Sequence, residues 1–302
     1  MNASVHQNVE EFILLGLDTY PKLSIALFIL LLIVYVLILF GNLLIMVTVY
    51  FEVCLHSAMY YFLSKLSLVD LCYATVTVPK MLINFLFFLH FFAGTECILL
   101  TVMAYDRYVA ICNPLRYSSM VNKTICYRLE VVCWAISFFH SIIQIILTCQ
   151  LQFCGSNRID HFFCDIHPLS VLSCSDKFII EIVFLANSGM IATLSFIILL
   201  ISYIKIINTV VKTKSDEGMG KAFSTCASHL IVVALFFGPS VFIYLRPSVS
   251  YEADKMVSIF YTVLTPLMNP IIYTLRNKEL LGGFQLILEN PFKVSGLPVA
   301  YY

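Results

Sequence analysis

The sequence predicts an all-α integral membrane protein, folded as a bundle of seven transmembrane helices. Of the 302 residues, 60% are hydrophobic and only 12% are charged, whereas a soluble protein carries about 25% charged residues. The uncharged run from Leu23 to Phe51 is longer than the roughly 20 residues that cross a bilayer as a helix. Helices are favoured over a barrel because the apolar runs are long and lack strict alternation.

Apolar runs divide the chain into an extracellular N-terminus (1–22), a membrane domain (23–275) and a cytoplasmic tail (276–302). The spans are expected at about 23–50, 58–82, 88–113, 130–151, 179–207, 222–246 and 255–275. Lys and Arg concentrate in the loops of one side, which predicts that this side and the C-terminus are cytoplasmic. An odd number of spans preserves this segregation, and an even number would spoil it.

The opposite side should face the lumen or the cell exterior. There, Asn2-Ala3-Ser4 is an acceptor triplet for glycosylation. Three cysteines, Cys154, Cys164 and Cys174, lie in one polar loop on the same side, where an oxidising compartment favours disulfides. The zero net charge gives no reason to expect a nucleic-acid partner, and membrane lipid is the expected surrounding.

Ionisable residues inside the spans are costly and mark functional positions. Asp70 lies in the middle of the second span and Glu96 within the third. A shared sodium ion is the simplest account of this pair, and a proton held between the two carboxyl groups is the alternative. Asp106 and Arg107 at the inner end of the third span have a simpler interpretation, as two charges at a membrane surface.

Polar and helix-breaking residues continue this theme in the first and seventh spans. Asn42 adds polarity to the first span, and Asn269 and Pro270 add polarity and a kink to the seventh. Packing and a bent helix are an adequate explanation of each residue alone. Together with Asp70, they indicate a polar seam through the bundle, as a protein that switches between two arrangements requires.

The segment MAYDRYVAICNPLRY (103–117) resembles an olfactory receptor, a rhodopsin-like G-protein-coupled receptor. Further matches occur in the family's order: EFILLGL (11–17), GN (41–42), LSLVDLCYAT (66–75), HFFCD (161–165), KAFSTCASHL (221–230) and PLMNPIIYTLRN (266–277). The resemblance implies an odorant receptor of the plasma membrane that activates an olfactory-type stimulatory heterotrimeric G protein and raises cyclic AMP. It also implies an activation switch made of Asp106, Arg107, Tyr108, Tyr203, Asn269, Pro270 and Tyr273.

The ligand expected from the resemblance is a small, hydrophobic, volatile molecule bound in the outer half of the bundle. Apolar walls with a few polar groups suit such a ligand, and ordinary helix packing is an equal explanation of any single residue. The candidate pocket residues are His90, Gly94, Asn187, Ser188, Phe237, Tyr244 and Thr262. In the outer loop, the resemblance pairs Cys154 with Cys174. The spacing of His161, Cys164 and His167 suggests a weak metal site, but no fourth ligand is evident, and we expect no metal or other cofactor apart from sodium.

The stretch PKMLINFLFFLHFFAGTEC (79–97) departs from the family because it is about 15 residues shorter than the family's pattern and lacks the first outer loop with its cysteine. Cys164 should therefore be unpaired, and a compressed turn is expected at 84–88. Two smaller departures are Lys65, where the family usually has asparagine, and a tail after Lys278 without the usual basic amphipathic helix.

These departures favour, as an alternative function, a non-signalling product retained in the endoplasmic reticulum. A transporter or channel with Asp70 and Glu96 on an ion path is less favoured because the chain shows no internal repeat. An enzyme is not expected, since the chain contains no catalytic or phosphate-binding motif.

Overall fold

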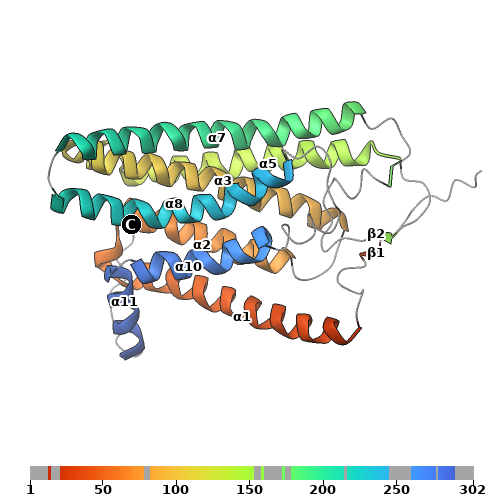
Figure 1. Cartoon of the computed structure of the whole chain (residues 1–302), viewed down its shortest axis with the longest axis horizontal. Helices are drawn as coiled ribbons and strands as arrows, with labels where there is room; N and C mark the ends of the chain where they lie inside the picture. The colour runs from red at the N-terminus through yellow and green to blue at the C-terminus, as the bar shows by residue number, and fades with distance from the viewer. Residues whose placement is uncertain are drawn as a thin grey trace, which may run out of the picture.

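The protein is a bundle of long helices packed side by side (Figure 1). The computed structural model describes residues 13–14, 21–77, 82–152, 158–159, 172–173, 178–213, 216–244, 260–276 and 278–289. A helix lies over each predicted span: α1 (Pro21–Phe51), α2 (Ala58–Thr77), α3 (Leu82–Cys112), α5 (Lys123–Cys149), α7 (Phe178–Thr213), α8 (Asp216–Tyr244) and α10 (Thr265–Arg276), the last preceded by the π-helix η3 (Phe260–Leu264).

Shorter elements complete the described chain. They are η1 (Val53–Leu55), η2 (Pro114–Arg116), α4 (Tyr117–Met120) and the tail helix α11 (Lys278–Glu289). A two-residue parallel pair, β1 (Ile13–Leu14) with β2 (Arg158–Ile159), adds a small strand element to the all-α architecture that the sequence predicts. It joins the N-terminal segment to the loop before α7, at the end of the bundle opposite α11 (Figure 1).

Within the part of the chain that the structure describes, four helical segments are each long and apolar enough to cross a membrane: Ile29–Phe51, Phe87–Cys112, Lys123–Cys149 and Ile182–Lys212. Large apolar side chains on α1, α5 and α7 point away from the bundle; Phe40, Phe139 and Ile204 are each more than half exposed. Such an apolar exterior is unfavourable in water and suits lipid. The chain is therefore a multi-pass membrane protein.

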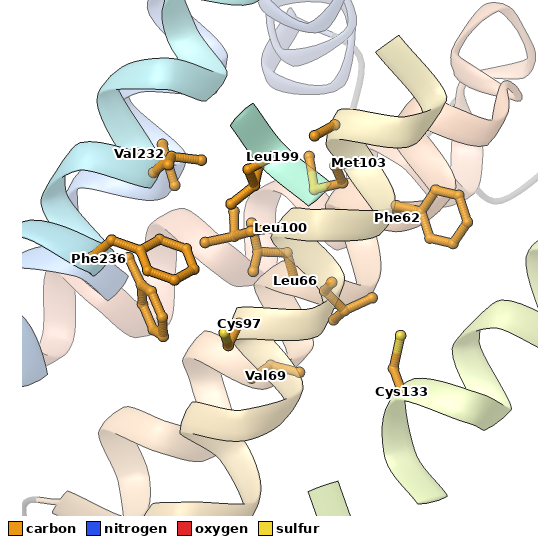
Figure 2. Close-up of a cluster of buried hydrophobic side chains, with 14 of the residues drawn as sticks. Phe62, Leu66, Val69, Cys97, Leu100, Met103, Cys133, Leu199, Val232 and Phe236 are labelled. Atoms are coloured by element: carbon orange, nitrogen blue, oxygen red, sulfur yellow. The ribbon is translucent and has the colours of Figure 1, made fainter. Parts of the chain in front are cut away.

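The helix α3 runs through the centre of the bundle and packs against α2, α5, α7 and α8. Its buried side chains Leu100 and Met103 belong to one cluster with Leu66 of α2, Leu199 of α7 and Phe236 of α8 (Figure 2). A residue on α3 can consequently meet partners from four other helices, which makes this helix the natural carrier of a site.

The predicted turn at 84–88 is wrong. Helix α2 ends at Thr77 and α3 begins at Leu82, so residues 84–88 lie inside α3. The physical reason is Pro79, which lacks a backbone N–H and disfavours helical geometry in the residue before it, whereas 84–88 holds no helix breaker. Only seven residues of α2 follow Asp70, about 10 Å of helix, so α2 is short on the predicted outer side.

The tail also differs from expectation, because α11 is an amphipathic helix even though it lacks the basic residues of the family. Leu280 and Phe284 are buried against Ile45 and Val49 of α1. Gly283 permits this contact, since a Cβ atom built there would lie 2.8 Å from Cγ2 of Thr48. The apolar spacing of this segment therefore forms a helix that docks on the end of α1.

Candidate functional site

A polar seam lies between α2, α3 and α10. Asp70 and Glu96 are fully buried, and Nδ2 of Asn269 donates a hydrogen bond to Oδ2 of Asp70 over 2.8 Å. Val69 and Cys97, the sequence neighbours of the two carboxylates, belong to the same core cluster (Figure 2). Oδ1 of Asp70, Oε1 of Glu96 and Oδ1 of Asn269 have no hydrogen-bond partner among the described residues.

This grouping of acceptor oxygens fits a small cation or a shared proton. Two buried carboxyl groups cannot both stay charged without compensation, because each loses its hydration. A hard monovalent ion such as sodium would be held by Asp70 and Glu96, with the Asn269 oxygen as a further ligand. Among the residues that the structure describes, no three His, Cys, Asp or Glu side chains are grouped to hold a metal ion.

The first and seventh helices meet through Asn42 and Pro270. Nδ2 of Asn42 donates to the carbonyl oxygen of Pro266 over 3.0 Å and to that of Ile38 over 3.1 Å. The Pro266 carbonyl would normally accept a bond from the N–H four residues later, and that residue is Pro270, which has none. Asn42 therefore supplies the hydrogen bond that the proline removes. Gly41 lets α1 approach, since a Cβ atom there would lie 3.1 Å from Cγ of Pro270.

Asp106 and Arg107 form an ion pair at the inner end of α3. Nε of Arg107 donates to Oδ2 of Asp106 over 3.1 Å, and the Tyr117 hydroxyl donates to Oδ1 over 2.7 Å. Asp106 is only 1% exposed, so it is a buried partner rather than a charge resting at the membrane surface. Burial, with a smaller contribution from the Asp106 carboxylate, raises the pKa of Tyr117 above its ordinary value, which keeps its hydroxyl protonated as a donor.

Further predicted switch residues lie close to this ion pair or to its helix. The Tyr203 hydroxyl is 2.5 Å from Nδ1 of His229, which joins α7 to α8. Nζ of Lys205 lies 5.2 Å from the centre of the Tyr108 ring. Tyr273 packs against both core clusters. The prediction from the sequence missed His229, which lies within the family-like segment 221–230. A single histidine in an apolar span could have indicated a buried hydrogen-bonding position there.

The predicted pocket residues of α3 and α7 gather around α5. The rings of His90 and His140 meet edge to face with 5.9 Å between centres. Nδ2 of Asn187 donates to the His140 carbonyl over 3.5 Å, and Nε2 of Gln144 donates to Oγ of Ser188 over 2.6 Å. The structure thus brings these predicted residues into one polar cluster between three helices, in which His90 is buried and Asn187 and Ser188 are half-buried.

No residue of α5 is among the predicted pocket residues, so the prediction from the sequence missed His140 and Gln144. The sequence does indicate a polar face on α5, because the spacing of Ser137, Ser141 and Gln144 places these three side chains on one face of the helix, and all three are fully buried. Gly94 of α3 faces the same group, since a Cβ atom there would lie 3.4 Å from Oγ of Ser137. Periodicity in the span from 130 to 151 therefore predicts an inward polar face.

The remaining predicted site residues lie elsewhere. Phe237 is buried in the core, with its ring 5.8 Å from that of Phe196, and Thr262 is buried in η3. The side chain of Tyr244 lies outside the described residues. The predicted glycosylation, disulfide and weak metal positions also lie outside them: Asn2, Cys154, His161, Cys164, His167 and Cys174.

Comparison with known proteins defines the class of receptor. The olfactory receptor family model matches residues 31–290. The chain is 50% identical to human olfactory receptor 4Q3 over 99% of both chains, and 49% identical to human olfactory receptor 4S2 over 90% of this chain and 92% of that one. Mouse olfactory receptor 4E2 is 48% identical over 92% and 95% of the two chains.

The chain belongs to the olfactory receptor family, as its sequence motifs predict. It is therefore a G-protein-coupled signalling receptor and not an enzyme. This chain is shorter than its alignment with olfactory receptor 4Q3. The alignment runs over 315 positions and this chain has 302 residues, so at least 13 alignment positions are gaps in this chain.

Proposed function

We propose that the protein is a plasma-membrane odorant receptor with seven spans, an external N-terminus and a cytoplasmic C-terminus. A small organic ligand binds in the outer half of the bundle, and the receptor activates an olfactory-type stimulatory G protein that raises cyclic AMP. The observation that carries this proposal is a polar cluster set among apolar helices, in which His90, His140 and Gln144 are buried and Asn187 and Ser188 are half-buried.

The cluster favours a ligand with one polar group on an apolar body. Nδ1 of His140 and Oε1 of Gln144 have no hydrogen-bond partner among the described residues. A ligand hydroxyl is able both to donate to the Gln144 oxygen and to exchange a hydrogen bond with His140. Leaving these buried groups unpaired costs free energy. The ligand should therefore bind most tightly to the arrangement of helices in which its hydroxyl reaches both His140 and Gln144.

Signalling then follows from a shift in population. A ligand that prefers the active arrangement increases its share of the molecules. The bonds of Asp106 with Arg107 and Tyr117 hold the inner end of α3 in the arrangement seen here, and activation would exchange them while α8 moves outward to admit the G protein. A sodium ion or proton between Asp70 and Glu96 would favour the inactive arrangement.

A cyclic AMP reporter in cells that express the olfactory-type G protein tests this function. A panel of small aliphatic and aromatic alcohols should yield an agonist. Gln144→Ala should raise the half-maximal agonist concentration about tenfold, the equivalent of one lost hydrogen bond of about 1.4 kcal/mol. Phe139→Ala is the matched control, because Phe139 lies on the same helix and is 65% exposed. Equal effects of the two substitutions would contradict the proposed site.

The alternative, a non-signalling product retained in the endoplasmic reticulum, is favoured by two observations. Only four residues, 78–81, separate the last residue of α2 from the first residue of α3 in the sequence. The alignment gaps also indicate that a relative has residues that this chain lacks. Surface labelling of an N-terminal epitope, compared with a variant given a full outer loop and its cysteine, separates the two functions. Labelling of the repaired variant alone would establish retention.

A further inference from the structure

Three polar side chains form a cluster between α2 and α5 that neither the predicted pocket nor the predicted switch uses. Nζ of Lys65 lies 3.1 Å from Oε1 of Glu130, and the Tyr61 hydroxyl donates to Oε2 of the same carboxylate. The lysine ammonium also lies 5.2 Å from the centre of the Tyr61 ring. Both oxygens of Glu130 therefore have a partner, and both partners come from α2.

The cluster is built by helix geometry. Tyr61 and Lys65 are four residues apart on α2, so they occupy the same face. Lys65 is the eighth residue of α2 and Glu130 the eighth of α5, so each lies about 10 Å from the start of its helix. Because both helices begin on the predicted cytoplasmic side, the two charges meet at the same depth.

Each charge depends on the other. The side chains of Lys65 and Glu130 are 29% and 12% exposed, and in a membrane the exposed part faces lipid rather than water. A single charge at this depth is costly in lipid, and a pair with satisfied hydrogen bonds is tolerated. Pairing therefore explains why lysine stands at a position where the family usually has asparagine.

We propose that Lys65, Tyr61 and Glu130 form an ion-pair clamp that fixes the inner half of α2 against α5. Two features give the clamp its importance. Only seven residues of α2 follow Asp70, so the outer part of this helix is short and the contacts of its inner half matter more for its position. In addition, Phe62 of α2 and Cys126 of α5 belong to the buried core cluster against which Tyr117 packs, so the two helices that the clamp joins also contribute to the packing beside Tyr117.

Thermal unfolding of the purified full chain in detergent tests the clamp without any ligand or G protein. Several free cysteines are buried, including Cys97 and Cys133, so a thiol-reactive dye reports unfolding. Lys65→Asn and Glu130→Gln should each lower the unfolding midpoint by about 5 °C or more, since each leaves one charge unpaired. The double variant should lose clearly less than the sum, because neither charge remains.

Two further variants complete the design. The charge exchange Lys65→Glu with Glu130→Lys should recover part of the midpoint, whereas Arg128→Gln, an exposed cation on α5, should leave it unchanged. If the single variants cannot be purified, purification of the folded double variant supports the clamp, and failure of the double variant to purify as folded protein overturns it. Strictly additive losses, or an unchanged midpoint for Lys65→Asn, would also overturn it.

Discussion

The hydrogen bond between Asn42 and the Pro266 carbonyl provides the sharpest test of how the first and seventh helices hold together. Asn42→Ala removes both bonds from its amide nitrogen. The Ile38 carbonyl keeps a helical partner in the backbone N–H of residue 42, whereas the Pro266 carbonyl is left without one, because Pro270 has no N–H. The loss is therefore concentrated on a single buried carbonyl.

Leaving a buried acceptor unsatisfied costs about 1–3 kcal/mol. Oδ1 of Asn42 has no partner among the described residues, and its removal offsets part of this cost. We expect a net loss of about 2 kcal/mol, which for a chain of 302 residues lowers the unfolding midpoint by about 3 °C. The assay is dye-detected thermal unfolding of the purified protein in detergent.

Thr48→Val is the matched control on the same helix. The Thr48 hydroxyl donates to the Leu44 carbonyl over 2.8 Å, but that carbonyl also has its ordinary helical bond and stays satisfied. The control should therefore cost less than about 1 kcal/mol. If Asn42→Ala and Thr48→Val lower the midpoint equally, the special role of the Pro266 carbonyl is refuted.

A second arm isolates the cause. Pro270→Ala restores an N–H that is able to reach the Pro266 carbonyl. In that background, Asn42→Ala should cost less than it does in the native chain, by about 1 kcal/mol. Losses that are simply additive would show that the asparagine stabilises α1 by some other contact.

The helix ends supply two local predictions. Gly283→Leu should displace α11 from α1 and lower the unfolding midpoint, because a Cβ atom at this position meets Thr48. Gly282→Leu should be tolerated, since a Cβ atom at residue 282 meets nothing within 4 Å. Equal effects of the two substitutions would contradict the docking of α11 on α1. Asn122→Ala should lower the free energy of unfolding by about 1 kcal/mol, since Oδ1 of Asn122 accepts a hydrogen bond from the Ile125 N–H at the start of α5. Asn122→Asp keeps an acceptor oxygen and should retain most of the stability. A loss for Asn122→Asp as large as that for Asn122→Ala would contradict the role of Asn122 as a helix cap.

Much of the architecture was determined by the sequence. Long uncharged runs require helices in lipid, so the helical membrane architecture could be predicted from residues alone, whereas several helix ends differ from the expected spans. The family was predicted separately from its motifs. Asp70 and Glu96 could be predicted as a candidate site because a carboxyl group in an apolar span needs a cation, a shared proton or a polar partner, and the ion itself stays a prediction. The predicted turn was misplaced because it was positioned by the number of residues that two full spans need, and not by the helix breaker Pro79. Pro79 is a local signal in the sequence that would have placed the turn earlier.

Only the tertiary structure decided which side chains meet across helices. The approach of Lys65 to Glu130, of Asn42 to the Pro266 carbonyl and of Gln144 to Ser188 depends on the rotation and depth of separate helices. Periodicity shows which face of a helix is polar, but it does not show which neighbouring helix that face contacts. These contacts join residues distant in the chain, so they are fixed by packing of the whole bundle rather than by any local pattern.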